Sequence, residues 1–487
     1  MSTIANQNYR GSYHFSPKAN WMNDPNGMVY FKGEYHLFYQ YHPSGLTWGP
    51  MHWGHAVSRD LVSWEELDIA LIPDQHGMIF SGSAVVDWHN TTGFFEEEPG
   101  LVAIFTHHAE GQQRPHAVQY QSLAYSKDQG RTWIKYEGNP VLRHETFVDF
   151  RDPKVFWHAP TSQWVMIVAC GQSVCLYHST NLKDWSLSSE FGEGIGFHGG
   201  VWECPDLFPL PVDGAEDQTK WVMLVSIGDH ADYPEGSRTQ YFTGDFDGRQ
   251  FVPDVLSCEK IRWLDYGRDN YAGVSWSDVP EEDGRRLFIG WMSNWKYANM
   301  TPTEGWRGAM TLVRELALRT IEGEVKLAQQ PAAELSAYRK PVLSLRSMTA
   351  EEMAEQLSGL RLESYEIEAE LNASHSADIK VRVGEGHETI IGYRSVDSEI
   401  YIDRTRSGLI GFHDEFSGRH SASVSRGDGR IEVRIFVDRS SVEVFVNGGE
   451  SVLTDLIYPG AAATGLSLAA EDCQLMIPVL RIYDLSV

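Results

Sequence analysis

The chain has 487 residues, which is too long for one ordinary hydrophobic core, so we expect two domains. Its net charge of −27 repels nucleic acid and anionic membrane surfaces, so neither is an expected partner. No stretch approaches the roughly 20 consecutive apolar residues that a membrane-spanning helix requires. The acidic residues are dispersed along the chain, which is typical of a solvated surface. The sequence leaves the oligomeric state unknown and a homodimer open.

The start of the chain, residues 1–15, lacks a basic region followed by an apolar one, so no signal peptide is visible. As written, the sequence indicates a cytoplasmic protein, or a secreted one if a signal peptide was removed. The cysteines are odd in number and scattered, without a Cys-x-x-Cys pair, so we expect buried free thiols and no zinc site. We expect no metal and no cofactor. The cysteines are Cys170, Cys175, Cys204, Cys258 and Cys473.

Short apolar runs bounded by Gly, Pro, Asn and Asp dominate the first two-thirds of the chain. Long stretches of helical periodicity are absent, so we predict an all-β protein. The expected strands include residues 27–40, 101–107, 164–169, 221–226 and 287–291.

A polar turn recurs in this region after an apolar strand. It has the pattern Ser-x-Asp/Asn followed by Trp at residues 58–64, 126–133 and 179–185, with a weaker copy at 243–248. Successive copies start 68, 53 and 64 residues apart, which fits one four-stranded sheet per repeat. Radial repetition of such sheets makes a β-propeller, and a fifth unit over about residues 265–316 completes five blades. Independent hairpins in a sandwich would not explain why the turn recurs.

Beyond about residue 324 the repeat stops. We expect a catalytic propeller domain over residues 10–325, a polar linker over 326–347 and a second domain over 348–487. Residues 348–358 are predicted to form a short helix or a loop. The strands that follow alternate apolar and polar positions between turns, which predicts a β-sandwich. They are residues 365–371, 378–383, 389–394, 399–403, 431–437, 441–446 and 466–470.

Three acids stand at or near the starts of successive repeat units, each close to a turn-forming proline. They are Asp24 in Trp-Met-Asn-Asp-Pro-Asn-Gly, Asp152 in Phe-Arg-Asp-Pro, and Glu203 in Trp-Glu-Cys-Pro-Asp. The first strand of every propeller blade lines the central channel, so equivalent positions in three blades would bring these carboxyl groups to one mouth. Glycoside hydrolysis requires two carboxyl groups flanking the scissile bond. Converging acids also suit a cation such as calcium, and that alternative stays open.

The order of these motifs resembles glycoside hydrolase family 32, the invertase, levanase and inulinase family. Other stretches match its pattern at residues 39–43, 53–55, 80–83 and 436–445, so the resemblance covers nearly the whole chain. It implies a five-bladed β-propeller followed by a β-sandwich. It also implies a retaining β-fructofuranosidase, which cuts terminal fructosyl units from levan, inulin, fructo-oligosaccharides and sucrose through a covalent fructosyl–enzyme.

The resemblance further implies a role for each acid. Asp24 is the nucleophile, Glu203 is the general acid/base, and Asp152, held by Arg151, stabilises the transition state. Glu203 has to be protonated when the bond breaks while Asp24 stays ionised, and an oxocarbenium-like transition state gains from nearby negative charge. Amides, hydroxyls and aromatic rings would hold the sugar. The implied substrate-binding residues are Asn23, Gln40, Trp48, Phe80, Ser81, Arg151 and Trp291, with Trp295 as an alternative to Trp291.

Residues 48–56 and 291–299 resemble levanases and exo-inulinases more than phosphosucrose hydrolases, which need a basic pocket that these motifs lack. Two alternatives remain. A fructosyltransferase would share all three acids and pass the fructosyl unit to a sugar hydroxyl instead of water. A non-catalytic sugar-binding propeller is less favoured, because a pure binder has no need of the nucleophile. The second domain shows no exposed aromatic row, so we expect a structural brace and not a carbohydrate-binding module.

Overall fold

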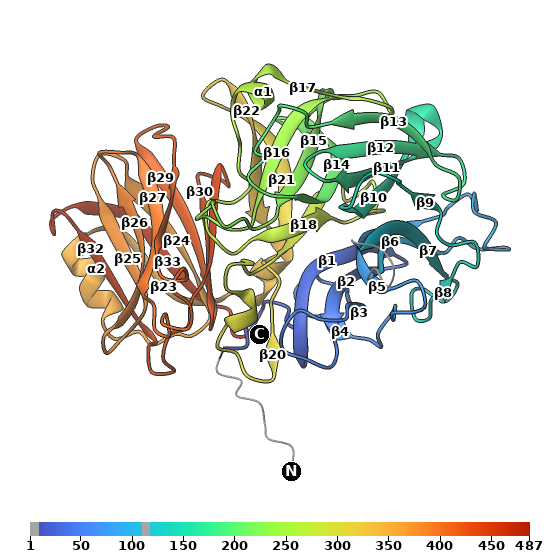
Figure 1. Cartoon of the computed structure of the whole chain (residues 1–487). Coiled ribbons are helices and arrows are strands. Elements are labelled where there is room, and N and C mark those ends of the chain that lie inside the picture. Colours follow the sequence, from blue (N-terminus) through green and yellow to red (C-terminus); the bar gives the residue numbers. More distant parts are fainter. Residues whose placement is uncertain (1–8, 110–116) are drawn as a thin grey trace, which may run out of the picture. The chain divides into compact units, whose positions relative to one another are not determined.

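The computed structural model describes residues 9–109 and 117–487. Strands dominate it (Figure 1), as the sequence predicts. Residues 1–8, which include part of the segment searched for a signal peptide, lie outside the described residues. The chain divides into two compact units, which we call the propeller unit and the sandwich unit. The propeller unit comprises Pro17–Trp263 and Tyr271–Trp291; the sandwich unit comprises Met1–Ser16, Leu264–Asn270 and Met292–Val487.

Antiparallel sheets succeed one another along the propeller unit, and the strands of each sheet pair in chain order. Among the strands of this unit, each sheet is therefore a meander that begins with its first strand. The first sheet has β1 (Asn20–Phe31), β2 (Glu34–His42), β3 (His52–Ser58) and β4 (Glu65–Glu66). The second has β5 (Met78–Val86), β6 (Leu101–Ala109), β7 (Val118–Ser126) and β8 (Ile134–Lys135), with β9 (Leu142–Arg143) on β7. The third has β10 (Phe150–His158), β11 (Gln163–Cys170), β12 (Val174–Ser179) and β13 (Ser186–Phe191). The fourth has β14 (Trp202–Val212), β15 (Ala215–Ile227), β16 (Arg238–Phe246) and β17 (Phe251–Pro253), followed by α1 (Val255–Glu259); the fifth contributes β18 (Tyr271–Ser275) and β19 (Arg286–Trp291) to this unit.

The first strands of the five sheets form a closed ring, and Figure 1 labels all five. Strand β1 lies beside β5, β5 beside β10, β10 beside β14, β14 beside β18, and β18 beside β1. Buried apolar side chains fill the space between successive blades. This arrangement is a five-bladed β-propeller, which confirms the predicted fold. The first strand of every blade therefore lines the central channel.

The recurring polar turn joins the third and fourth strands of a blade. In the first copy the hydroxyl of Ser58 accepts a hydrogen bond from the amide N–H of Leu61 at 2.8 Å. The copies that begin at Ser126 and Ser179 make equivalent bonds between side chains and the backbone. Short polar side chains offer the backbone a partner outside the ladder, which ends the third strand at the same place in each blade.

Four of the five expected propeller strands are observed; three change by one or two residues at their ends, and the strand expected at 221–226 begins six residues earlier, at Ala215. The run 27–40 is instead two strands, β1 and β2, joined at Lys32 and Gly33. Both joining residues have positive φ angles, 48° and 88°, which suit a two-residue hairpin turn. Apolar residues on both sides of this short turn made the run look continuous in the sequence.

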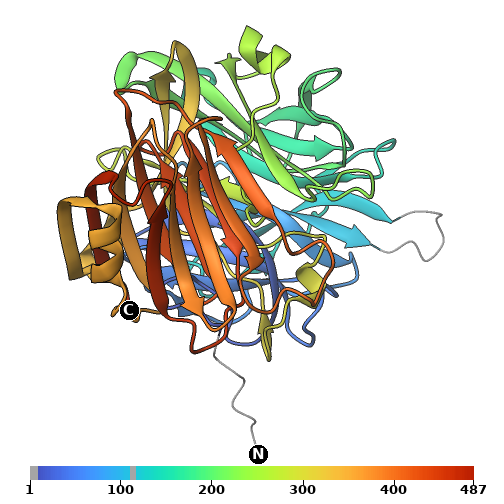
Figure 2. The ribbon, with the colours of Figure 1, turned by 90° about the vertical axis from the view of Figure 1, so that its left-hand side faces the viewer.

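Two antiparallel sheets share one apolar core in the sandwich unit. Their orders are β23-β33-β24-β29-β30-β31 and β28-β27-β26-β25-β32. Helix α2 (Ala350–Leu357), expected as a short helix or loop, packs against β32 (Figure 2). All seven expected sandwich strands are present. The strands are β23 (Lys340–Thr349), β24 (Tyr365–Asn372), β25 (Ala377–Gly384), β26 (His387–Arg394), β27 (Glu399–Arg406), β28 (Arg419–Ser423), β29 (Arg430–Val437), β30 (Ser441–Val446), β31 (Ser451–Leu456), β32 (Gly465–Ala470) and β33 (Met476–Asp484); β20 (Trp306–Arg307), β21 (Arg314–Ile321) and β22 (Glu324–Pro331) precede them.

Residues 326–347, expected as a polar linker, contain strand residues at both ends. Strand β22 pairs with β21 at the start of this segment, and β23 pairs with β33 at its end. Strand β23 lies at the edge of its sheet and is largely exposed, so its sequence carries no clear alternation of apolar and polar residues. Edge position therefore explains why the strand was missed.

A buried ionic network joins the N-terminal segment of the sandwich unit to β30. The ring of His14 contacts Asp438 Oδ2 and Glu443 Oε1, both at 2.8 Å, and Arg314 donates to Glu443 Oε2 at 2.6 Å. Burial opposes charge on His14, but the two carboxylates outweigh it and raise the pKa of His14 to about 9. Although burial acts the other way, these cations hold the pKa of Asp438 and of Glu443 at about 2.

These shifts predict that the network of His14, Asp438 and Glu443 contributes most to stability between about pH 4.5 and 6.5. A raised pKa stabilises the fold below the unfolded value of 6.5, and this contribution is lost as the pH rises through about 9. The depressed carboxyl pKa values stabilise the fold above about 4.5, and this contribution is lost as the pH falls towards about 2. The melting temperature of a His14→Gln variant should lie furthest below that of the parent in this window. A difference that stays constant from pH 5 to pH 9 would contradict the assignment.

The expectation of five buried free thiols is wrong. Cys170 and Cys175 form a disulfide across the β11–β12 hairpin, with Cα atoms 6.2 Å apart. Cys258 and Cys473 are exposed, and Cys204 is the one buried free thiol among the described residues. The pairing depends on a hairpin turn, which the spacing of the cysteines did not reveal.

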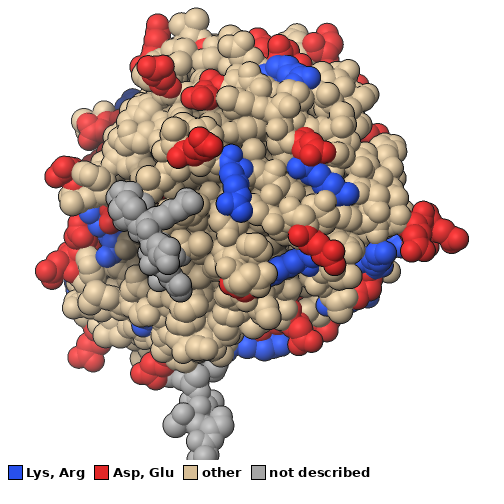
Figure 3. Space-filling view, turned by 45° about the vertical axis from the view of Figure 1, so that its right-hand side comes forward, with Lys and Arg blue, Asp and Glu red and all other residues tan. Residues whose placement is uncertain are grey.

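Charged side chains of both signs are interspersed on the face shown in Figure 3, in agreement with the dispersed acids of the sequence. No helix within residues 9–109 and 117–487 is long and apolar enough to cross a membrane.

Candidate active site

The three predicted catalytic acids lie at the start of three inner strands, β1, β10 and β14. Each lies where the pairing register of its strand is interrupted, and a proline follows within two residues. Proline cannot donate to the ladder, so it fits such an irregularity, and a bulge redirects the side chain beside it. Asp152 has a positive φ of 65°, a strained conformation that the surrounding strands hold in place. This geometry explains why each acid is coupled to a proline in the sequence.

Asp24 is partly exposed and held by two neighbours. Its Oδ1 accepts a hydrogen bond from Asn23 Nδ2 at 3.0 Å, and its Oδ2 accepts one from Ser81 Oγ at 2.8 Å. Burial and the Glu203 carboxylate raise the pKa of Asp24, while the bonds from Asn23 and Ser81 oppose that rise. The structure thus brings two of the predicted substrate-binding residues against the predicted nucleophile.

The thiol of Cys204 lies between two of the acids. Its Sγ is 3.6 Å from Asp24 Oδ2 and 3.5 Å from Asp152 Oδ2, and its backbone N–H donates to Asp152 Oδ2 at 3.0 Å. Burial raises the pKa of Asp152 to about 7; Arg151 opposes this shift, and Glu203 and Asp24 add to it. A buried donor shared by two carboxylates keeps both oriented towards one space.

Glu203 is held on both of its oxygens. Oε1 accepts from Arg151 Nε and Nη2 at 3.2 and 2.8 Å, and Oε2 accepts from the hydroxyl of Tyr271 at the start of β18. Arg151 also forms the expected ion pair with Asp152, at a longer distance of 3.9 Å from Nε to Oδ2. Arg151 also donates to Asp149 and Gln119. Its guanidinium therefore orients Glu203.

The predicted aromatic residues fall into two groups. Trp48 is 41% exposed and meets Phe80 edge to face, with ring centroids 6.0 Å apart, so this pair offers an accessible apolar surface beside Ser81. Trp291 is 0% exposed and packs against Trp21 at 5.9 Å, so its ring supports the site from behind and is not open to a sugar. Its alternative, Trp295, belongs to the sandwich unit.

Comparison with known proteins identifies the family. The model described as "Glycosyl hydrolases family 32 N-terminal domain" matches residues 14–331, and the model "Glycosyl hydrolases family 32 C terminal" matches residues 334–484. The chain belongs to glycosyl hydrolase family 32. It is therefore a glycoside hydrolase, as the sequence predicted.

Relatives within family 32 cover nearly the whole chain. A levanase of Bacillus subtilis (strain 168) is 50% identical over 99% of this chain and 71% of its own length. An extracellular exo-inulinase of Aspergillus ficuum is 40% identical over 95% of this chain and 92% of its own length. The crystal structure of exo-inulinase from Aspergillus awamori superposes with a TM-score of 0.90 at 37% identity, covering 99% of both chains.

Two residues of this family 32 site were not predicted from the sequence. Cys204 was set aside as a buried thiol, and Tyr271 was not considered because strand β18 was not predicted. Tyr271 starts the fifth inner strand, as the acids start theirs. Asking which residue begins each inner strand would have found it.

Gln40 on β2 is the clearest candidate for a direct contact with the ligand. Its side chain is 3% exposed, and in the described part of the chain its Nε2 has no hydrogen-bond partner. A buried amide donor without a partner costs about 1–3 kcal/mol of stability.

We therefore expect Gln40→Leu to lower kcat/KM on sucrose about 10- to 100-fold without lowering the melting temperature. Steady-state kinetics and thermal melting of the same preparation check this. Asn139→Leu is the contrasting control, because both of its amide atoms bond to the backbone of Leu123 and its loss should destabilise the fold. Unchanged kinetics for Gln40→Leu would exclude Gln40 from the site.

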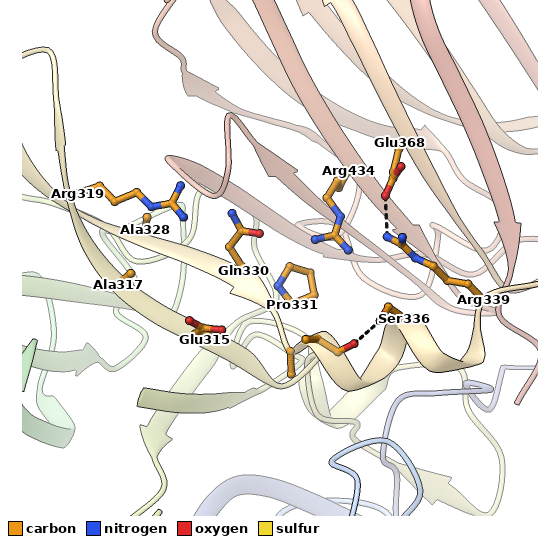
Figure 4. Close-up of a pocket in the computed structure, with 12 residues that line it drawn as sticks. Glu315, Ala317, Arg319, Ala328, Gln330, Pro331, Ser336, Arg339, Glu368 and Arg434 are labelled. Atoms are coloured by element: carbon orange, nitrogen blue, oxygen red, sulfur yellow. Dashed lines mark hydrogen bonds and ion pairs between the residues drawn. The ribbon is translucent and has the colours of Figure 1, made fainter. Parts of the chain in front are cut away.

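Neither a metal site nor a cavity in the sandwich unit is a better candidate for the active site. Within residues 9–109 and 117–487, no group of three or more His, Cys, Asp or Glu side chains could hold a metal ion. A cavity of about 480 Å³ in the sandwich unit is lined by Arg319, Arg339 and Arg434 (Figure 4). Arg339 and Arg434 already pair with the neighbouring glutamates, so little charge is left for a ligand. No predicted site residue lines it.

Proposed function

We propose that the chain is a retaining β-fructofuranosidase acting on terminal β-D-fructofuranosyl residues of levan, inulin, fructo-oligosaccharides and sucrose. Asp24 is the nucleophile, Glu203 the general acid/base and Asp152 the transition-state stabiliser. The observation that carries this proposal is the meeting of these three carboxyl groups at one end of the inner strands, two sharing the thiol of Cys204. The B. subtilis levanase and the Aspergillus exo-inulinases support the substrate class.

Catalysis proceeds in two displacements. Asp24 attacks the anomeric carbon of the fructosyl unit while protonated Glu203 gives its proton to the departing oxygen. Glu203 then takes a proton from water, which attacks the same carbon and releases Asp24 as a carboxylate. Negative charge on Asp24 and Asp152 stabilises the oxocarbenium-like transition states.

The neighbours of the acids have separate tasks. Arg151 and Tyr271 fix the position of Glu203 on both of its oxygens. Asn23 and Ser81 orient the nucleophile, and Gln40 donates to a sugar hydroxyl. Trp48 and Phe80 cover the carbon face of the sugar. Trp291 is assigned to packing behind the site.

Two further assignments accompany this function: the roles of the domains and the site of action. We propose that the propeller unit is the catalytic part of the chain and that residues 348–487 form a bracing sandwich; the propeller unit ends at Trp291, before the expected bound of 325. Within the sandwich unit, the backbone N–H and the hydroxyl of Thr454 donate buried hydrogen bonds to Asp265, which supports the brace because truncation near residue 330 would remove them. The Aspergillus relative is named as extracellular, which favours an extracellular site of action over a cytoplasmic one.

The test is fructose release from sucrose, inulin and levan, with products resolved by chromatography. Free fructose that appears from the first minutes, with no chain longer than the donor at high sucrose, supports hydrolysis. Chains longer than the donor would identify a fructosyltransferase instead. Binding to all three sugars without turnover would overturn the proposal in favour of a sugar-binding propeller.

A further inference from the structure

A second cavity, of about 490 Å³, lies in the propeller unit on the side away from the acids. The acids occupy the starts of the inner strands and do not line this cavity; its lining begins two and three residues further on, at Lys154 and Asp206, and most of it comes from later positions. These include Val86 at the end of β5, Phe156 near the end of β10 and Asp278 just after β18. Phe156 follows Asp152 by four residues, which is about 13 Å along a strand. The aromatic part of the cavity is therefore separate from the acids, and Lys154 lies between the two on the same strand.

Aromatic side chains form the wall of this cavity. Trp88 is 55% exposed, yet its indole N–H donates to Asp278 Oδ1 at 2.8 Å and its ring meets Phe31 edge to face at 6.0 Å. Asp278 is itself anchored, because its Oδ2 accepts from the backbone N–H of Val86 at 2.9 Å. An exposed ring with a fixed orientation is suited to stacking on a flat apolar face. Five further rings line the cavity: Phe156, Trp157, Trp164, Phe208 and Trp221.

The two basic and the two acidic side chains of the cavity compensate one another in charge. One of the two cations, Arg286, keeps N–H donors available for a ligand. Lys154 lies 3.6 Å from Asp206 and donates to a backbone carbonyl. Arg286 lies over the ring of Phe208 at 5.1 Å and donates to the carbonyl of Trp276 at 3.3 Å. Among the described residues its guanidinium forms no ion pair within 4.0 Å; burial lowers its pKa, and Asp206 and Asp278 oppose this shift from further away. With Lys154 and Arg286 against Asp206 and Asp278, the cavity favours a neutral ligand rich in hydroxyl groups.

We propose that this cavity is a second saccharide-binding site, which holds one or two sugar units of a fructan chain away from the catalytic acids. Trp88 stacks on the carbon face of a sugar ring, and Arg286 donates to its hydroxyls. The volume lies within the range of small-molecule sites. That the saccharide is a fructan rests on the proposed function. The site tethers polymeric substrate and takes no part in bond cleavage.

The test is affinity electrophoresis in native gels that contain levan or inulin, with dextran gels for comparison. An Asp24→Asn background keeps the polymer intact during the run. Trp88→Ala and Arg286→Met should each raise the apparent Kd for levan or inulin about fivefold, the loss expected of one aromatic or polar contact. Trp88→Phe should stay near the parent, because it keeps a ring. The matched control is Val252→Ala on β17, a residue of similar exposure (54%) outside the cavity.

Kinetics of the same substitutions in the active enzyme complete the test. Trp88→Ala should raise KM for the polymers and leave kcat and sucrose turnover unchanged. Retardation by fructan gels that is equal for the parent and both cavity variants would overturn the inference, as would retardation by dextran alone. If the parent releases no fructose but the cavity variants still weaken fructan binding, the proposed function fails and the second site stands.

Discussion

Replacing Asp24 by asparagine is expected to lower kcat on sucrose, inulin and levan by roughly 10,000-fold or more. The amide keeps the size of the side chain and can still accept from Ser81, but it cannot form the fructosyl ester. Reducing-sugar assays measure the loss, and the melting temperature should not fall, because burial and Glu203 already disfavour charge at this position. Activity within a factor of about ten of the parent would remove Asp24 from the nucleophile role.

Glu203→Gln separates the two acid roles. Loss of the general acid should lower kcat on sucrose by about 100- to 10,000-fold and should matter much less for an activated aryl fructoside, whose leaving group needs no proton. Asp24→Asn should be inactive on both substrates. Asp60→Asn is the matched control, since Asp60 lies in the outer turn after β3. The side-chain oxygen of the new asparagine can still accept the hydrogen bond from the backbone N–H of Ser63. If both site variants lose the same factor on the aryl fructoside, the division of roles is wrong.

Replacing Arg404 on β27 by leucine is expected to destabilise the fold by about 3–5 kcal/mol. The Arg404 side chain is fully buried; it pairs with Asp269 at 2.6 Å and donates to Tyr297 Oη at 2.9 Å and to the carbonyl of Phe416 at 2.7 Å. Leucine would leave the buried carboxylate of Asp269 without its cation. The midpoint of urea-induced unfolding, followed by circular dichroism, measures the effect.

The neighbouring arginine on the same strand provides the control. Arg406 pairs with Glu388 at 3.0 Å, but its side chain is 60% exposed. An exposed ion pair contributes about 1 kcal/mol or less, so Arg406→Leu should move the midpoint little. Equal shifts for the two variants would show that burial of the Arg404 pair does not determine its contribution.

Much of the fold could be predicted because it is encoded locally. The turn after each third strand is made by side chains that bond to backbone atoms a few residues away, so a copy such as Ser126–Trp133 is visible without the rest of the blade. The alternating strand β29 shows its buried face in the sequence over its first half, whereas β30, expected to have one solvated face, is buried at every position. Strand β23 was missed because an exposed edge strand needs no such alternation.

The site was predictable only in part, for a related reason. Asp24, Asp152 and Glu203 stand in distinctive motifs beside prolines that fit strand irregularities. Cys204 and Tyr271 gain their importance from what they touch across blades, and no local pattern marks them. Likewise, a tryptophan in a matching motif is equally compatible with sugar stacking and with packing, and only burial assigned Trp291 to packing.

The sequence by itself determined the all-β class, the repeating blades and the family motifs, and it singled out the three acids proposed for catalysis. These features depend on residues close together in the chain. Only the tertiary structure decided that Arg151 holds Glu203, that Cys204 bridges two carboxylates and that Cys170 pairs with Cys175. It alone revealed the aromatic cavity around Trp88. Contacts between strands depend on how the chain closes around the channel, and closure brings together residues that are far apart in the sequence.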